Sequence, residues 1–310
     1  QDKGSSQHIM TNVMVKKGKQ AKWKDSMIEL RNHNLIIYHK GKKEHTIDLK
    51  TSTLNRKGDL MDNQTEDQNY RSFQINTTKE GFVFLFVEFK TFTTWLTLLG
   101  LQMRTVGTYG YPLRVACLKS GWRYPVPFFR SIQYMRYNGG IHEQGIFRLS
   151  PNATDMNVVK EILNSDATSE SIDFGSIRIA ASVCKNYLSS LDDTLIPFDF
   201  YDDFVAAGAI SDIKCRAKEL RRIVGKLPTI NQNCLWYLID FLHLVSLNSN
   251  ENKMTASNLA VCFGPSCVRN LCLEPVKAAA DLKNIQNAFE CLINEYSDIF
   301  KYIKAENERI

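Results

Sequence analysis

Arg148 is the residue whose chemistry stands out most in this chain, and it lies in the segment GIFRLS at residues 145–150. The segment falls between two stretches that are expected to be helical, so the arginine is predicted in a loop. A guanidinium is a planar, permanently charged fork of N–H donors that suits phosphate and carboxylate oxygens. Taken alone, however, one arginine in a turn is typical of a solvated surface side chain.

Three further segments follow Arg148 along the chain. KNYL at residues 185–188 precedes LIP at 195–197, LPTIN at 227–231 leads into an apolar helix, and NKMTASNLAVCFGP occupies residues 252–265. Together, in this order and at these separations, the segments resemble the RhoGAP domain, which activates GTP hydrolysis by Rho-family small GTPases. The last segment is the most specific of the four.

The resemblance implies that Arg148 is a catalytic arginine, inserted into the active site of a Rho-, Rac- or Cdc42-type GTPase in its GTP-bound form. Phosphoryl transfer needs positive charge where the γ-phosphate oxygens become more negative, and an arginine supplied in trans is worth roughly 10³–10⁵ in rate. The partner would bind GTP and Mg²⁺. We therefore expect no cofactor or metal in this chain, and no GTP hydrolysis of its own.

The resemblance also assigns supporting roles to three other residues. Lys185 would lie beside the arginine loop and help to fix the partner's switch region, Asn258 would hydrogen-bond at that surface, and Pro265 would shape the neighbouring contact. Each has a structural alternative. These alternatives are a solvated helix lysine, a capping or buried asparagine, and a proline that ends a helix.

The chain departs from the family pattern close to these residues. Ser189 stands where many members have an arginine four residues after the lysine, and SLDDT at residues 190–194 replaces a Glu-Leu-Pro-Glu-Pro run. Gln144 and Pro151 also differ from the usual residues. Since Arg148 is present we expect stimulated hydrolysis, with a loosened loop and a reduced rate caused by Ser189. The alternative is a non-catalytic adaptor that binds Rho-family GTPases without accelerating hydrolysis.

The elements that must position these residues are helical. Apolar residues recur at spacings of three and four over residues 154–164, 178–191, 199–208, 212–225, 231–248, 254–263 and 278–303, which predicts an all-α domain. Asn231 and Thr255 are predicted to cap two of these helices. We expect the domain to span residues 113–305 and to follow a linker at residues 105–112.

The first third of the chain has a different pattern. Short β-branched and aromatic segments at residues 27–30, 35–38, 72–75 and 82–87 predict strands, with hairpin turns at 32–34 and 40–42. A polar stretch at 55–69 predicts a mobile loop, and residues 91–103 predict one helix. The expected fold is a small β-barrel capped by a C-terminal helix. Residues 8–104 resemble a pleckstrin homology domain, through Lys22-Trp23-Lys24, residues 35–38 and Trp95.

A basic cluster lies in the same region. Residues 1–104 hold 17 Lys and Arg against 11 Asp and Glu, whereas residues 105–310 hold 22 of each. Lys17, Lys19, Lys22 and Lys24 would lie at the open end of the barrel and attract anionic membrane lipids, although a solvated basic face fits them equally well. Ser26 replaces an arginine of the family's inositol-binding pattern, which favours weak, charge-driven membrane association.

Composition excludes several classes of protein. A hydrophobic content of 44% with 23% charged residues is typical of globular domains, and no run of 18 apolar residues is present. The polar first ten residues predict no signal peptide, and eight cysteines without a CxxC pair indicate a reducing environment. The aromatic residues near the basic cluster look like core strand residues, so no nucleic-acid partner is expected. We expect a cytoplasmic regulator of small GTPases and the actin cytoskeleton, whose first domain targets it weakly to membranes or to a partner.

Overall fold

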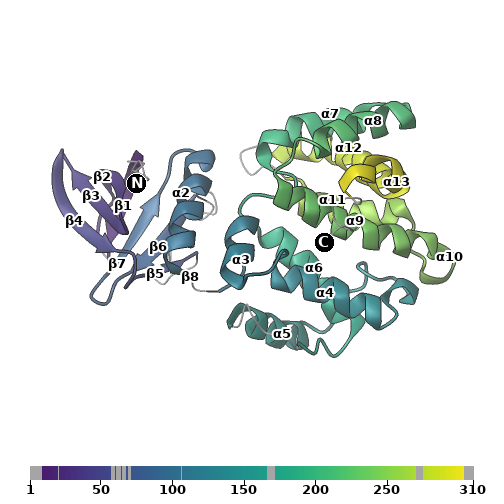
Figure 1. The fold of residues 1–310 in the computed structure, drawn as a ribbon, viewed down its shortest axis with the longest axis horizontal. Coiled ribbons are helices and arrows are strands. Elements are labelled where there is room, and N and C mark those ends of the chain that lie inside the picture. Colours follow the sequence, from purple (N-terminus) through teal and green to yellow (C-terminus); the bar gives the residue numbers. More distant parts are fainter. Residues whose placement is uncertain are drawn as a thin grey trace, which may run out of the picture. The chain divides into compact units, whose positions relative to one another are not determined.

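The structure is a computed structural model that describes residues 9–19, 21–56, 60, 64, 68, 71–105, 107–165, 172–269 and 275–303. It divides into two compact units, Gln1–Val115 and Ala116–Ile310, drawn in Figure 1. Most of the polar stretch at 55–69, predicted to be a mobile loop, lies outside the described residues. The first unit extends beyond the predicted linker because Tyr111 is buried in its core, where its hydroxyl donates a hydrogen bond to the Leu54 carbonyl.

The first unit contains one eight-stranded sheet in the order β4-β3-β2-β1-β7-β6-β5-β8. The strands are β1 (Ile9–Lys17), β2 (Lys24–Arg31), β3 (Asn34–His39), β4 (Lys42–Asp48), β5 (Thr53–Asn55), β6 (Ser72–Asn76), β7 (Gly81–Leu85) and β8 (Arg104–Thr105). Neighbouring strands are antiparallel, except that β8 runs parallel to β5. The predicted hairpin turns are confirmed, with positive φ at Asn32 and His33 and again at Lys40 and Gly41.

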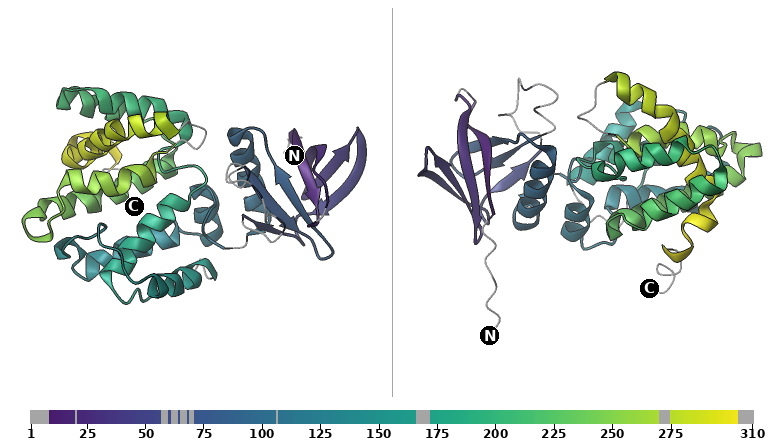
Figure 2. Two further views of the ribbon diagram at one scale, coloured as in Figure 1. Left: turned by 180° about the vertical axis from the view of Figure 1, so that it is seen from behind. Right: turned by 90° about the horizontal axis from the view of Figure 1, so that it is seen from above.

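Helix α2 (Phe89–Gln102) packs its apolar side against this sheet (Figure 2). Phe92, Trp95 and Leu99 are buried in the same hydrophobic cluster as strand residues such as Ile28 and Phe84. A helix with one apolar stripe must cover that stripe, and the open side of a curved sheet offers a matching surface. The predicted small β domain with one C-terminal helix is confirmed.

The second unit is helical, as predicted. Its helices are α3 (Leu113–Ser120), which begins at the end of the first unit, α4 (Val126–Tyr137), α5 (Ala153–Ser165), α6 (Ile177–Ser190), α7 (Tyr201–Ala209), α8 (Ile213–Val224), α9 (Thr229–Leu247), α10 (Ser249–Asn252), α11 (Ala256–Cys267), α12 (Pro275–Asn294) and α13 (Tyr296–Ile299), with 3-10 turns η2 (Gly140–His142) and η3 (Phe198–Phe200). Each predicted helical segment coincides with a helix, the last being split into α12 and α13. No residue range was predicted for α3, α4 or α10, although a helical stretch was expected before the arginine segment.

Helices α6 and α11 form the framework of the site. Helix α6 packs against α4 and α11, and α11 also packs against α9 and α12. Figure 1 shows α9 and α11 between the pair α4–α6 and the group formed by α7, α8 and α12. The buried residues Leu188 on α6 and Leu259 and Phe263 on α11 contribute to this helical core.

One of the two predicted helix caps is wrong. Thr255 caps α11 by accepting a hydrogen bond from the Asn258 backbone N–H, as expected. Helix α9 instead begins at Thr229, directly after Pro228, so Asn231 lies within its first turn. The Asn231 side chain is buried and donates to the Leu195 carbonyl at 3.0 Å. Asn231 therefore ties α9 to the segment before η3.

The described residues contain no helix that is both long enough and apolar enough to cross a membrane. Within those same residues, no group of three His, Cys, Asp or Glu side chains is arranged to hold a metal ion. The cysteines that the structure describes are free thiols, most of them buried.

Candidate functional site

Arg148 lies in the loop between η2 and α5, and its side chain is exposed. The two residues before it are anchored in the core, since Ile146 is 1% exposed and Phe147 is 2% exposed. The Phe147 ring meets the Phe263 ring of α11 edge-on, with 4.7 Å between their centroids. Because the Phe147 ring is held in the core, the backbone at Arg148 is fixed and its side chain extends outward from the protein surface.

The backbone of residues 145–150, which we call the arginine loop, is tightly turned. Gly145 has φ +69° and Phe147 has φ +68°, both in the left-handed region. The backbone N–H groups of Arg148 and Leu149 donate to the Gly145 carbonyl at 3.0 and 3.1 Å. A phenylalanine in the left-handed region carries a steric cost, which the surrounding packing must offset.

Lys185 lies on α6, and its side chain is half-buried. Its Nζ donates a hydrogen bond to the Phe147 carbonyl oxygen at 2.5 Å. Helix α6 begins at its Ser176 cap, and burial of Cys184 and Leu188, on either side of Lys185 in the sequence, fixes the helix in the core. The chain thus brings Lys185 together with the arginine loop. Ser189, one turn later on α6, is exposed.

Asn258 and Pro265 both belong to α11. The Asn258 side chain is half-buried and donates to the Lys253 carbonyl at 3.2 Å. Pro265 is exposed and lies inside the helix, which continues to Cys267, so it does not end the helix. Pro265 is therefore a surface residue of α11.

The electrostatic surroundings of Cys262 show that the arginine loop lies near α11. Burial raises the pKa of its thiol, while the positive charges of Lys185 and Arg148 act in the opposite direction. Both cations therefore lie near the half-buried Cys262 of α11. A thiol with a raised pKa is mostly protonated at neutral pH and is a poor nucleophile. The cationic pair, and not the thiol, gives this surface its chemical character.

Sequence reasoning assigned no role to three residues that hold the loop. Asn252, the last residue of α10, accepts a hydrogen bond at its carbonyl oxygen from the Gly145 N–H at 2.8 Å. Glu143, just before the loop, accepts from Arg178 of α6 at 2.9 Å. The only signal for Asn252 was its place inside the most specific of the four segments.

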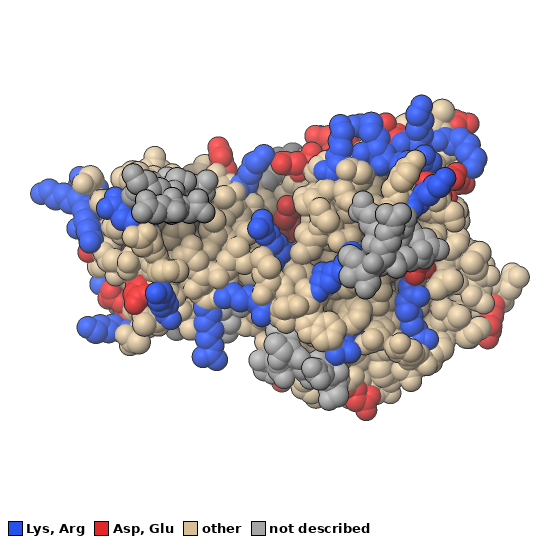
Figure 3. Space-filling view, viewed as in Figure 1, with Lys and Arg blue, Asp and Glu red and all other residues tan. Residues whose placement is uncertain are grey.

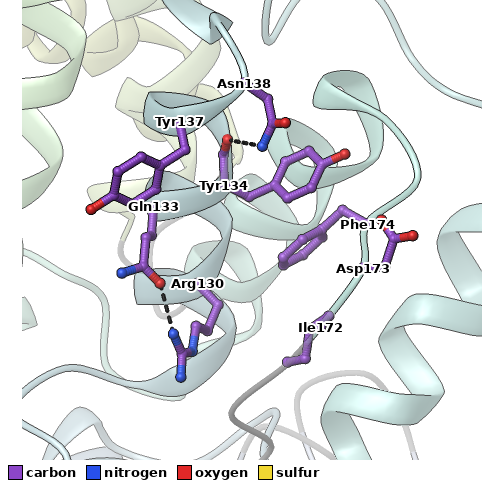
Figure 4. A pocket seen from close by; sticks show the side chains of 8 residues that line it. All are labelled: Arg130, Gln133, Tyr134, Tyr137, Asn138, Ile172, Asp173 and Phe174. Atoms are coloured by element: carbon purple, nitrogen blue, oxygen red, sulfur yellow. Dashed lines mark hydrogen bonds between the residues drawn. The ribbon is translucent and has the colours of Figure 1, made fainter.

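A separate hollow of about 490 Å³ lies between α4 and the segment that precedes α6 (Figure 4). Its lining residues are Arg130, Gln133, Tyr134, Tyr137, Asn138, Ile172, Asp173 and Phe174. The Arg130 guanidinium lies 4.6 Å from the Trp122 ring centroid and donates to Gln133 Oε1 at 2.7 Å. None of the residues predicted to be functional lines this hollow.

The basic cluster of the first unit surrounds a cavity of about 320 Å³ whose lining includes Lys17, Lys22 and Lys24. Lys17 forms an ion pair with Glu80 at 2.7 Å, and Lys24 forms one with Glu44 at 2.6 Å. The hydrogen bond from Lys24 is the main cause that lowers the Glu44 pKa. Acidic side chains within the protein thus offset part of the cluster's charge. Figure 3 shows Lys and Arg side chains on both units, with Asp and Glu among them.

Comparisons with known proteins agree on the helical unit. Residues 125–271 match the family model of the RhoGAP domain. Rho GTPase-activating protein 24 of Mus musculus is 30% identical over 181 residues, which cover 57% of this chain and 24% of that protein. SH3 domain-binding protein 1 of Homo sapiens is 30% identical over 201 residues, covering 62% and 28%. The chain therefore spans only about a quarter of the length of these relatives.

Solved structures point to the same fold. The BH domain from GRAF, the GTPase regulator associated with focal adhesion kinase, is 29% identical with a TM-score of 0.52, covering 57% of this chain and 93% of that chain. Human Rho GTPase activating protein 15 is 24% identical with a TM-score of 0.58, covering 63% and 92%. At that identity, the second likeness concerns the fold alone.

Proposed function

Because the chain carries a RhoGAP domain at residues 125–271, we propose that it activates GTP hydrolysis by a Rho-family small GTPase, using Arg148 as the catalytic arginine. The partner is a Rho-, Rac- or Cdc42-type GTPase in its GTP-bound form. The partner holds GTP and Mg²⁺ and positions the attacking water. This chain supplies the charge of one guanidinium and hydrolyses no GTP by itself.

The observation that carries the proposal is the contrast between Arg148 and the residues before it. The Arg148 side chain is exposed, whereas Ile146 and Phe147 are buried and the Phe147 carbonyl is bonded to Lys185. A catalytic arginine must reach out of its own protein and yet need little reorganisation on binding. An exposed guanidinium on an anchored loop meets both conditions.

The expected contribution of Arg148 follows from the charge that develops in the reaction. Negative charge grows on the bridging and γ-phosphate oxygens, and a guanidinium placed there in a water-excluded site stabilises it strongly. The gain is roughly 10³–10⁵ in rate, or about 4–7 kcal/mol of barrier. Lysine would substitute poorly, because a point charge lacks the planar fork of donors.

The remaining residues of the site would serve the same interface. Lys185 would hold the arginine loop through Phe147 and lie near the partner's switch region. Asn258 and Pro265 of α11 would contact the same surface, and the exposed position of Pro265 and the half-buried amide of Asn258 are consistent with this. These residues bind and orient, so only Arg148 would touch the reacting atoms.

A single-turnover assay with Rho, Rac and Cdc42 proteins loaded with GTP tests the proposal. Arg148→Ala should abolish stimulation while leaving binding to a GTPase with a non-hydrolysable analogue largely intact. Arg221→Ala is the matched control, because Arg221 is an exposed arginine of α8. If Arg148→Ala stimulated hydrolysis like the wild type, the assignment of Arg148 would be wrong. Binding by the wild type without acceleration of any GTPase would instead identify an adaptor.

The first unit supports a second, weaker proposal, namely peripheral association of a cytoplasmic protein with anionic membranes through Lys17, Lys19, Lys22 and Lys24. The supporting observation is the basic cavity, and the two ion pairs that partly neutralise it argue for weak attraction. Each basic charge near an anionic surface contributes about 1 kcal/mol, screened by salt.

Liposome sedimentation tests this second proposal. Lys22→Glu should reduce binding to anionic vesicles, whereas Lys50→Glu, at an exposed lysine outside the cavity lining, should have less effect. Vesicles of equal charge with and without phosphoinositides should bind equally. A strong preference for phosphoinositides would contradict the charge-driven mechanism.

A further inference from the structure

Asn252 is fully buried, and all the hydrogen-bonding groups of its side-chain amide are used. Its Nδ2 donates to the Val245 carbonyl in the last part of α9 and to the Ile141 carbonyl of η2, both at 2.8 Å. Its Oδ1 accepts from the Met254 N–H at 2.7 Å. One side chain therefore connects α9, η2 and the segment that leads into α11.

The backbone of the same residue holds the arginine loop directly. The Asn252 carbonyl accepts from the Gly145 N–H at 2.8 Å, and the Gly145 carbonyl accepts from the N–H groups of Arg148 and Leu149. The side chain of Asn252 meanwhile holds Ile141, four residues before Gly145. The chain is thus fastened to Asn252 both at η2 and at the first residue of the loop.

Two further polar contacts lie outside this buried one. His142 Nδ1 lies 2.7 Å from Glu251 Oε2, and Arg178 Nε lies 2.9 Å from Glu143 Oε1. The His142 and Glu251 side chains are both more than half exposed. Solvent therefore screens this contact, and it contributes little. Water competes much less for the amide bonds of Asn252 than for these two contacts, so Asn252 holds this end of the loop more firmly than they do.

We infer that Asn252 is the positioning residue of the arginine loop, and that it supplies the support which Ser189 does not provide. The inference rests on the proposed function, because its kinetic consequence is expressed through Arg148. Only a side chain with two donors and an acceptor at this length satisfies the carbonyls of Val245 and Ile141 together with the Met254 N–H. Aspartate lacks the donors, and serine can replace only part of the set.

The test uses the whole chain and the variant Asn252→Ser, which keeps one hydroxyl at the site. The matched control is Asn231→Ser, because Asn231 is also a buried asparagine of the helical unit and donates to the Leu195 carbonyl, outside the arginine loop. Both variants should lower the melting temperature. Only Asn252→Ser should increase hydrogen–deuterium exchange in peptides covering residues 145–150, by about tenfold.

The kinetic readout separates positioning from general stability. Asn252→Ser should lower the maximal single-turnover rate about tenfold and change the half-saturating GTPase concentration less than about threefold. In an Arg148→Ala background the same substitution should cause no further loss, because both changes act through one guanidinium. Asn231→Ser should retain the wild-type maximal rate at a temperature where it is folded.

Each other outcome has a definite meaning. Unchanged exchange over residues 145–150, or a wild-type maximal rate in folded Asn252→Ser, would overturn the inference. A full tenfold loss that persists in the Arg148→Ala background would show that Asn252 acts by another route. If the wild type accelerates no GTPase, the proposed function fails, and the exchange comparison still decides whether Asn252 holds the loop.

Discussion

Lys185 Nζ donates a hydrogen bond at 2.5 Å to the carbonyl oxygen of Phe147, the residue immediately before Arg148. The bond joins a half-buried cation on α6 to a backbone segment in the left-handed region. It satisfies a carbonyl that faces the helix and leaves the next side chain free to point outward. Lys185 therefore acts on the arginine through the backbone.

Removal of this cation should lower the stimulated rate without unfolding the protein. A hydrogen bond from a charged donor contributes about 1.5–3 kcal/mol, so Lys185→Ala should reduce the maximal single-turnover rate about 10- to 100-fold. Lys218→Ala, at an exposed lysine of α8, is the control and should stay near the wild-type rate. An unchanged rate in Lys185→Ala would show that Phe147 is held well enough by its ring packing.

The left-handed backbone at the start of the loop gives a second prediction. Gly145 has φ +69°, and a Cβ there would lie 3.0 Å from Leu149 Cδ1. Gly145→Ala should therefore destabilise the protein by about 1–2 kcal/mol and lower the stimulated rate, because Leu149 and its neighbour Arg148 must shift.

Gly121 offers a matched control for this substitution. It has φ +71°, but an added Cβ would meet nothing within 4 Å. Gly121→Ala should cost about the same backbone strain, measured by chemical denaturation, without loss of stimulated hydrolysis. Equal losses of activity in both variants would mean that strain alone, and not displacement of the loop, explains the effect.

The sequence predicts the helices of the site because the relevant signals are local. Apolar residues at helical spacing mark α6 and α11, and Thr255 caps α11 from the position at which a capping residue is expected. The same holds for α2, whose stripe contains Trp95. The bounds of helix α4 could not be predicted in this way. Pro125 and Pro127 stand at its beginning, and prolines are typical of loops although they also suit a first helical turn.

Contacts between distant segments could not be predicted in this way. Asn252 and Ile141 are 111 residues apart in the sequence, and their hydrogen bond exists only because α10 and η2 pack together. For Asn231, a contact was predicted but with the wrong partner. A residue type that favours caps was expected at a helix start, but Asn231 lies within the first turn of α9 and its side chain bonds to the Leu195 carbonyl. Residue type indicates hydrogen-bonding capacity, whereas packing decides the partner.

Asp193 predicts a pH dependence of stability. Burial, the largest cause, raises the pKa of its carboxyl from 3.8 to about 6, although the Phe198 N–H, which donates to it at 3.1 Å, acts in the opposite direction. The folded state therefore holds this proton more tightly than the unfolded state does. The contribution to stability is fully present below about pH 4 and is lost as the pH rises through 6.

Asp193→Asn removes this titration and keeps an oxygen that accepts from Phe198. The variant should be more stable than the wild type at pH 7.5, by about 2 kcal/mol, with the difference disappearing towards pH 4. Thermal unfolding at a series of pH values measures it. Asp155→Asn, at an exposed aspartate of α5, should not reproduce this pattern. A variant that loses stability at pH 7.5 would show that the ionised carboxylate is needed by the Phe198 N–H.

Ser189 provides the most direct test of whether the arginine loop lacks support. An arginine at this exposed position, one turn after Lys185, would supply the side chain that the family resemblance predicts there. Because Lys185 already bonds Phe147 and Asn252 already bonds Gly145, we expect Ser189→Arg to raise the stimulated rate by less than about threefold. Ser211→Arg, which adds the same charge at an exposed serine before α8, controls for general attraction to an acidic GTPase.

The size of the rate change in Ser189→Arg distinguishes a mobile arginine loop from one that is already held in place. A rise of about tenfold or more in Ser189→Arg alone would mean that the loop is mobile in the wild type and that the bonds of Asn252 and Lys185 do not suffice. An equal rise in Ser211→Arg would instead assign the gain to electrostatic steering, which disappears at high salt. A small change in both variants is the expected result, because a loop that is already held gains little from another donor.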